Sequence, residues 1–243
     1  RIMAVQFNPI PVHSEAWYSY RNSGIGASQV STILGINPYQ SSLRLFHEKI
    51  GIVKNNVKNL RMWIGLKSEP INHDLFEYWD ENEEVFLKNL ETNNKVRQLE
   101  EVSAYCTNSD LPFLFSSLDR RFKNKDGDYV LVEFKNKTYQ AYKQFENEIN
   151  PNDLIQLSTQ LLTSTYKYGF IVYLIDNTRY EVFKMTYKEA LAMKPTIMQG
   201  VKGFWSRVEK ARIIISQIYH AKESYNMKLV AQNEMELLQC EPE

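Results

Sequence analysis

The chain has 243 residues, 43% of them hydrophobic and 24% charged, and its formal net charge at pH 7 is zero. A chain of this length can bury a substantial core in one large domain or two small ones, and the composition is ordinary for a globular protein. A neutral chain has no overall electrostatic attraction to nucleic acid, which argues against a protein that coats DNA. No apolar run approaches the about 18 residues that a membrane-spanning helix needs.

The cysteines and histidines match no common disulfide or metal motif. Cys106 and Cys240 lie far apart, so neither a disulfide framework nor a zinc site is indicated. The four histidines are scattered and form no H-E-x-x-H cluster. No signal peptide is recognisable, although the chain opens on Arg1, and we expect a reducing, cytoplasmic setting.

The N-terminal segment contains a turn that could hold an anion. Residues 1–13 read as an extended arm, and Ser14 is placed to cap a short helix that runs to about Arg21. The glycine-rich stretch 24–28 then leads into a helix, whose free N–H groups favour an anion. Gln29 occupies the third glycine position of a dinucleotide fingerprint and no Gly-Lys-Ser/Thr follows, so a plain helix start remains the alternative.

Helices are predicted next, followed by strands. Ser41 can cap a helix that runs to Ile50, and a longer helix starts near Val57. We expect Pro70 to interrupt this helix just after Glu69. Strands are then predicted at 85–87, 96–105 and 113–118.

The second half of the chain mixes strands and helices. A helix is predicted over 139–149, and Pro151 opens another on which Gln156 and Gln160 face the same direction. A hairpin is predicted from 168–175 and 180–185, and the chain is helical from Tyr187 onward. Since no repeat or linker divides the chain, we predict a single domain over 1–243, with an arm at 1–13 and a C-terminal helical extension at about 187–243. Its fold is α/β (α+β), with a mixed central β-sheet flanked by helices.

The stretch from Ser116 to Asn136 carries the strongest chemical signal. Alternation along its last strand places Glu133 and Lys135 on the face opposite Val132. Asp126-Gly127 is a hairpin tip, so the chain folds back and brings Asp119 towards Glu133. Two carboxylates and a lysine on paired strands make a Mg²⁺ site together with a group that can position or deprotonate water. The alternative is that these charges form a solvated sheet face.

Several separated motifs occur in one order and together resemble a known family. They are Arg21 with Gly24-Ile25-Gly26-Ala27-Ser28, Leu34-Gly35-Ile36-Asn37-Pro38-Tyr39, Gly65-Leu66-Lys67-Ser68-Glu69-Pro70, Ser117-Leu118-Asp119, Val132-Glu133-Phe134-Lys135-Asn136, Gln156 through Leu162, and Phe204-Trp205. The set resembles the YqaJ-like viral recombinases, relatives of phage lambda exonuclease within the PD-(D/E)XK nucleases. This resemblance implies a restriction-endonuclease-like core.

The resemblance also implies roles for the chemical groups. Asp119 and Glu133 match metal-binding carboxylates, and the backbone carbonyl of Phe134 would be a further ligand. Lys135 matches the catalytic lysine, and Glu69 matches a helix glutamate that supports a second metal. The implied cofactor is Mg²⁺, with Mn²⁺ expected to substitute.

Further matches concern the substrate and the surroundings of the site. Gln156 matches the glutamine of a helix beside the active site, and Arg21 and Ser28 match a pair that holds the 5′-phosphate end of DNA. Two positions depart from the pattern. Gln29 stands in place of a usual acid, and Arg120 replaces a frequent glycine, which would make the mouth of the site more basic.

The implied function is a 5′→3′ exonuclease that resects linear double-stranded DNA for phage-type recombination. Its expected partners are double-stranded DNA ends and a single-strand annealing protein, and a trimeric ring is the expected assembly. A phage-encoded enzyme would act in the bacterial host cytoplasm. The alternatives are a structure-specific or nicking endonuclease with the same metal site, and a catalytically silent DNA-end-binding or inhibitor protein.

Overall fold

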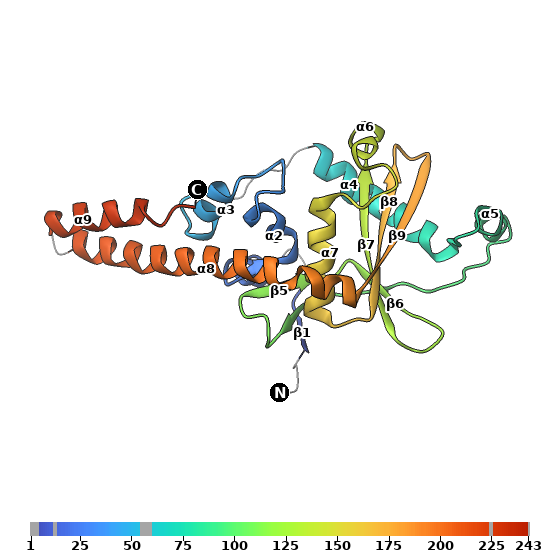
Figure 1. Cartoon of the computed structure of the whole chain (residues 1–243), viewed down its shortest axis with the longest axis horizontal. Coiled ribbons are helices and arrows are strands. Elements are labelled where there is room, and N and C mark those ends of the chain that lie inside the picture. Colours follow the sequence, from blue (N-terminus) through green and yellow to red (C-terminus); the bar gives the residue numbers. More distant parts are fainter. Residues whose placement is uncertain (1–4, 12–13, 54–59, 224–225, 243) are drawn as a thin grey trace.

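The computed structural model describes residues 5–11, 14–53, 60–223 and 226–242 (Figure 1). From the N-terminus, the elements are β1 (Val5–Pro9), α1 (Glu15–Asn22), β2 (Ile25–Gly26), α2 (Ala27–Ile33), α3 (Ser42–Lys49), α4 (Leu60–Tyr78), α5 (Glu83–Glu91), β3 (Glu100–Glu101), β4 (Ala104–Asn108), β5 (Leu114–Ser117), β6 (Arg120–Lys123), β7 (Tyr129–Lys137), α6 (Tyr139–Tyr142), the 3₁₀ helix η1 (Lys143–Phe145), α7 (Pro151–Ser164), β8 (Tyr168–Ile175), β9 (Arg179–Thr186), α8 (Tyr187–Glu223) and α9 (Met227–Leu238).

The strands form two mixed sheets where the sequence predicts a single central one. The larger has the order β3-β6-β7-β8-β9, and the smaller has the order β1-β4-β5-β2. In the larger sheet only β7 and β8 are parallel, and in the smaller sheet only β2 and β5 are. The predicted class, a mixed sheet flanked by helices, is confirmed.

Helices α7 and α4 cover opposite faces of the larger sheet (Figure 1). Leu131 of β7 points to the α7 side and packs with Leu161 in the main core. Val132 and Phe134 point to the other side and pack with Phe76 of α4. The strand is therefore buried on both faces, and its side-chain alternation follows the predicted pattern.

Helix α7 lies in the middle of the molecule. It is packed between the larger sheet and helices α2 and α8, and it also contacts β4 and β5. Because neighbours surround it, nearly all of its residues are buried, including its glutamines and serines. Polar groups of this helix must therefore find partners within the protein.

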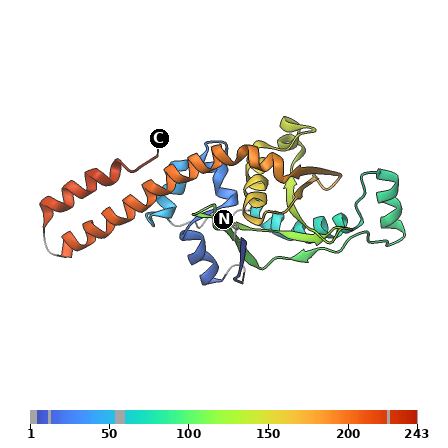
Figure 2. The same ribbon diagram turned by 60° about the horizontal axis from the view of Figure 1, so that its bottom comes forward.

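Helices α8 and α9 form an antiparallel hairpin that projects away from the sheets (Figures 1 and 2). The chain then returns to α3, where His47 Nε2 lies 2.8 Å from Glu241 Oε1. No helix in the described part of the chain is both long and apolar enough to cross a lipid bilayer.

Four local predictions are wrong. The single strand predicted at 96–105 is instead the short β3, Glu100–Glu101, and the start of β4, with no strand at 96–99. Helix α4 runs through Pro70 without interruption. Residues 85–87 lie in helix α5, because Asn82 accepts hydrogen bonds from the backbone N–H groups of Glu84 and Val85 and so caps a helix there. The helix predicted over 139–149 ends early, as α6 followed by η1. The predicted start near Val57 lies outside the described residues.

Other local predictions are confirmed. Ser14 caps α1 by accepting from the Trp17 N–H at 3.1 Å, and Ser41 caps α3 in the same way. Gly127, with φ 82°, forms the tip of the hairpin between β6 and β7. Within the predicted arm, residues Val5–Pro9 form β1 and pair with β4.

Candidate active site

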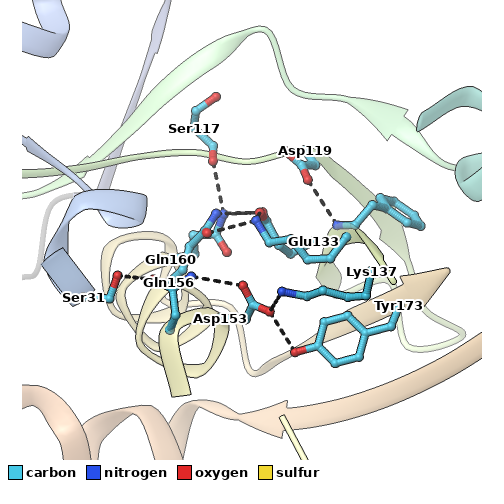
Figure 3. A network of polar contacts seen from close by, with 12 residues as sticks. Ser31, Ser117, Asp119, Glu133, Lys137, Asp153, Gln156, Gln160 and Tyr173 are labelled. Atoms are coloured by element: carbon cyan, nitrogen blue, oxygen red, sulfur yellow. Dashed lines mark hydrogen bonds and ion pairs between the residues drawn. The ribbon is translucent and has the colours of Figure 1, made fainter. Parts of the chain in front are cut away.

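Glu133 lies at the centre of a polar cluster between β7 and α7 (Figure 3). Its side chain is 2% exposed and accepts three short hydrogen bonds. Lys135 Nζ donates to Oε1 at 2.7 Å, Gln156 Nε2 donates to Oε1 at 2.5 Å, and Gln160 Nε2 donates to Oε2 at 2.6 Å. A buried carboxylate with this many donors is held in one orientation.

The two glutamines come from one face of α7, as their spacing predicts. Gln156 bridges the pair on β7, because its amide nitrogen donates to Glu133 while its oxygen accepts from Lys135 Nζ at 3.0 Å. Gln160 also donates to the Ser117 carbonyl at 3.2 Å, which ties β5 to the same cluster. Its Oε1 atom is buried and has no hydrogen-bond partner among the described residues.

Lys135 is a cation in this setting. Burial alone would lower its pKa, but the carboxylates of Glu133, Asp153 and Asp119 together raise the pKa of Lys135 above its ordinary value. Lys135 therefore acts as a hydrogen-bond donor in this arrangement and carries no free lone pair.

Asp119 lies between β5 and β6, directly before the residue that pairs with Val132 of β7. Its Oδ2 atom accepts from the Phe134 N–H at 3.1 Å, so it sits beside Glu133 as the hairpin predicts. Loss of solvation and the neighbouring Glu133 raise the pKa of Asp119 well above its ordinary value, although Lys135 and the Phe134 N–H partly oppose this. The two carboxylates of Asp119 and Glu133 thus lie close together with Lys135 as the cation that partly compensates their charge.

A cavity of about 460 Å³ opens beside these groups. Its walls come from α1, β2, α2, α4, β3, β5, β6 and α7, and from the segments that follow β3 and β5. The lining residues are Trp17, Arg21, Gly26, Ala27, Ser28, Glu69, Glu101, Val102, Phe115, Ser117, Leu118, Asp119, Arg120 and Gln156. The structure therefore brings Arg21, Ser28 and Glu69 to the same cavity as Asp119 and Gln156.

Glu69 reaches the cavity from α4. Its Oε1 atom lies 3.3 Å from Nε2 of His73, one turn further along the helix. Asn136, at the end of β7, donates to the Ser68 hydroxyl and to the Gly65 carbonyl, the latter at 3.4 Å. These bonds fix the helix turn that carries Glu69 against the strand that carries Glu133.

Arg21 is placed by the end of α1. Its guanidinium lies 4.6 Å over the Trp17 ring, and the Tyr105 hydroxyl of β4 donates to the Trp17 carbonyl at 3.2 Å. Lys49 Nζ donates to the carbonyls of Arg21 and Gly24, at 2.5 Å and 2.6 Å. The Arg21 side chain thus lines the cavity, while bonds from Lys49 and Tyr105 to backbone carbonyls tie α1 to the fold.

Ser28 lies in the first turn of α2, and its side chain is exposed to the cavity. Gln29, which stands where the family usually has an acid, accepts from the Gly26 N–H at 3.1 Å and so caps α2. Gly24 has a packing role, because a Cβ atom there would lie 2.7 Å from the Phe113 carbonyl oxygen.

The donors fit a hard divalent cation in part. Asp119, just before β6, and Glu133 of β7 supply neighbouring carboxylate oxygens, and a cation would relieve the repulsion by Glu133 that, after burial, helps to raise the pKa of Asp119. Within the described ranges there is no group of three or more Asp, Glu, His or Cys side chains that could hold a metal ion together. Glu69 therefore lines the cavity without joining the carboxylate pair.

A second polar cluster extends the site and was missed from the sequence (Figure 3). Asp153 of α7 is 1% exposed and lies 2.7 Å from Lys137 Nζ, and it accepts from the Tyr173 hydroxyl at 3.0 Å. Asn152 links this cluster to Ser31 of α2, at 2.5 Å. A signal was present, since Lys137 repeats the alternation of β7 and Asp153 precedes Gln156 by one helical turn.

Fold and site together define the class of protein. A mixed sheet flanked by helices, with these carboxylates and the lysine on adjacent strands, is a restriction-endonuclease-like fold. The chain is similar to the crystal structures of LHK-Exo, an alkaline exonuclease from Laribacter hongkongensis, with and without dAMP. The TM-scores are 0.62 and 0.61 at 17% identity, over 88% of this chain and 100% of those chains. At this identity the similarity concerns the fold.

The sequence pattern of the YqaJ-like viral recombinase domain matches residues 16–167, which is more than half of the chain. The chain therefore belongs to the YqaJ-like viral recombinase family.

Curated relatives share a shorter segment. Protein D345L of African swine fever virus (strain Badajoz 1971 Vero-adapted) is 33% identical over 64 residues, which are 26% of this chain and 19% of that protein. Protein D345L of isolate Tick/South Africa/Pretoriuskop Pr4/1996 is 34% identical over 64 residues, with the same coverage. The match spans about a fifth of the length of these relatives.

Proposed function

We propose that this chain is a Mg²⁺-dependent DNA nuclease that resects linear double-stranded DNA from the 5′ end. The observation that carries the proposal is the cavity in which Asp119, beside Glu133, shares a wall with Arg21 and Ser28. Acidic groups suited to a divalent cation and cationic groups suited to phosphate thus line one space.

Each group of the cluster has a part in this proposal. Bound Mg²⁺, which Mn²⁺ is expected to replace, would neutralise charge on the scissile phosphate and lower the pKa of a nearby water. Asp119 and Glu133, with the Phe134 carbonyl, would hold the cation, and Glu69 would support a second one. Lys135, which is protonated, would orient the attacking water or stabilise developing charge. Gln156 and Gln160 would keep the Glu133 carboxylate in place.

The relatives support the reaction class. LHK-Exo is described as an alkaline exonuclease and has been crystallised with dAMP, a deoxynucleotide. The family pattern is that of a viral recombinase, in which an exonuclease would prepare single strands. We accordingly propose a single-strand annealing protein as partner, a trimeric ring as the assembly, and the cytoplasm of a bacterial host as the setting.

The decisive experiment compares linear duplex with covalently closed circular DNA. We expect Mg²⁺-dependent release of nucleotides from the linear substrate and none from the circle, and Asp119→Ala should remove the activity while leaving the fold intact. Nicking of the closed circle would favour the second candidate, an endonuclease with the same site. Binding of DNA ends without any cleavage would indicate a catalytically silent protein.

A further inference from the structure

Arg120 and Arg121 are neighbours on β6 whose side chains have different surroundings. They pair in antiparallel register with Glu101 and Glu100 of β3. Arg121 forms an ion pair with Glu100, its cross-strand neighbour, with Nε 3.1 Å from Glu100 Oε2. The guanidinium of Arg121 also lies 3.9 Å over the Tyr129 ring. The Arg121 guanidinium is therefore held by contacts within the protein.

Arg120 lines the cavity beside Asp119. Its Nη1 atom donates to the carbonyl of Asp119 at 2.7 Å. Across the described ranges it forms no ion pair, and Glu101 opposite accepts instead from the Ser103 hydroxyl at 3.1 Å. A guanidinium carries five N–H donors in a planar fork, so this single contact leaves most of the fork for a ligand.

The charges of the cavity favour a phosphate as that ligand. Arg120 reaches the cavity from β6, and Arg21 reaches it from α1. The carboxylates of Asp119 and Glu69 in the same cavity would repel a polyanion unless cations accompany them. A guanidinium fork matches the oxygens of a phosphate group, and a phosphate chain offers more than one such group.

We propose that Arg120 binds a backbone phosphate of the DNA strand in the cavity, separate from the terminal phosphate proposed for Arg21 and Ser28. The inference rests on the proposed nuclease function and adds a substrate-binding residue to it. Arg21 would distinguish a terminal phosphate monoester from a hydroxyl. Arg120, which contacts a diester, contributes equally whether or not the 5′ end is phosphorylated.

The test measures DNA binding in EDTA, where no cleavage occurs. The affinity of duplexes with a 5′-phosphate or a 5′-hydroxyl is followed by fluorescence anisotropy over a series of KCl concentrations. Arg120→Gln removes the charge and keeps a donor for the Asp119 carbonyl, and Arg121→Gln removes the same charge from the next residue. We expect Arg120→Gln to raise Kd about tenfold for both duplexes and to reduce the slope of log Kd against log salt by about one. Arg121→Gln should leave the slope unchanged.

Several outcomes would overturn the proposal. Equal losses in the two variants would show an effect of overall charge alone, and a loss confined to the 5′-phosphorylated duplex would assign Arg120 to the terminal phosphate. Unchanged binding in Arg120→Gln would also refute it. Arg120→Lys guards against a folding defect, since it should restore the slope, and failure to do so would count against the proposal. If the wild-type chain bound neither duplex and also showed no Mg²⁺-dependent cleavage, the nuclease function itself would fail and this inference with it.

Discussion

At the scale of single residues, the metal site proposed at Asp119 can be tested through the free energy of unfolding. Its pKa is higher in the folded chain than in the unfolded one. The folded state therefore binds more protons between the two values, and the free energy of unfolding falls as pH rises through that window. Without metal, the Asp119 carboxyl group therefore lowers the stability of the fold at a pH above the ordinary pKa of an aspartate.

Asp119→Asn should relieve this cost. We expect a higher Tm than wild type in EDTA at pH 8, by roughly 2–4 °C per kcal/mol relieved, and no difference near pH 3, where both states are protonated. Mg²⁺ should raise the Tm of the wild-type chain and not that of the variant. Differential scanning calorimetry measures both effects, and Asp126→Asn at the exposed hairpin tip is the control. Equal Mg²⁺ stabilisation in the variant would contradict the metal assignment.

Lys135 fits its position as an ammonium group. Its Nζ atom lies between oxygens of Glu133 and Gln156, at 2.7 Å and 3.0 Å, a geometry that the larger planar guanidinium of arginine does not reproduce. We expect Lys135→Ala to reduce single-turnover cleavage by about 10²-fold or more, and Lys135→Arg not to restore it. DNA binding in EDTA should survive in both variants. Full activity of the arginine variant would mean that only the charge is needed.

The role proposed for Arg21 is the recognition of a DNA end. A phosphate monoester carries more charge than an internal diester, so a guanidinium beside the Ser28 hydroxyl favours a 5′-phosphorylated end. We expect wild-type protein to degrade 5′-phosphorylated duplex faster than 5′-hydroxyl duplex, and Arg21→Ala to remove most of this difference. Gel-based initial rates on the two substrates measure it. A wild-type rate that is independent of the 5′ group would mean that Arg21 only ties α1 to the fold.

At the scale of elements, α1 depends on cations from other helices. None of its side chains is buried. Its C-terminal carbonyls accept from Lys49 of α3 and from Arg212 of α8, whose Nη2 atom lies 2.7 Å from the Asn22 carbonyl. Arg212 also donates to the Lys49 carbonyl, at 2.6 Å. The end of α1 that carries Arg21 is therefore held by the side chains of Lys49 and Arg212.

Lys49→Met should loosen the end of α1. We expect faster hydrogen exchange in α1 and a smaller preference for 5′-phosphorylated ends, with cleavage of 5′-hydroxyl duplex changed by less than about twofold, because the carboxylate pair is untouched. Arg44→Met, at an exposed position of α3, is the matched control. An unchanged 5′-phosphate preference in Lys49→Met would show that α1 is held by other contacts.

Lys49 also predicts a pH dependence of stability. Burial, with Arg21 and Arg212 nearby, lowers the pKa of Lys49 to about 7. The unfolded chain binds more protons between that value and the ordinary lysine pKa, so the free energy of unfolding should rise with pH from about 7 to about 10. Urea denaturation of wild type and Lys49→Met across this range isolates the contribution. Parallel curves for the two proteins would refute it.

At the scale of the whole molecule, the expected trimeric assembly can be tested directly. The projecting α8–α9 hairpin carries exposed apolar side chains, namely Ile213, Tyr219, Met227, Met235 and Leu238. The family resemblance leads us to expect a trimer, with a mass three times the 28.6 kDa of one chain. Light scattering during size-exclusion chromatography at several concentrations gives the mass directly. A monomeric mass at micromolar concentration would contradict the ring.

The sequence by itself determined the centre of the site. Side-chain alternation along β7 fixes which face carries Glu133 and Lys135, and the Asp126-Gly127 turn fixes the register that brings Asp119 alongside. The i, i+4 spacing of the two glutamines predicts that both face one direction, and in the structure both donate to Glu133. These are short-range properties, because backbone geometry sets side-chain direction over a few residues.

Only the tertiary structure decided what lies around that centre. Residues 85–87 fit a strand pattern but form α5, because Asn82 caps a helix there, and α4 continues through Pro70 against the core. The placing of Arg21, Arg120 and Glu69 around one cavity depends on how α1, β6 and α4 pack on the sheet. Such packing depends on shape complementarity between segments far apart in the chain, and the shifted pKa values of Asp119 and Lys49 depend on the burial that results. No local pattern in a single sequence carries that information.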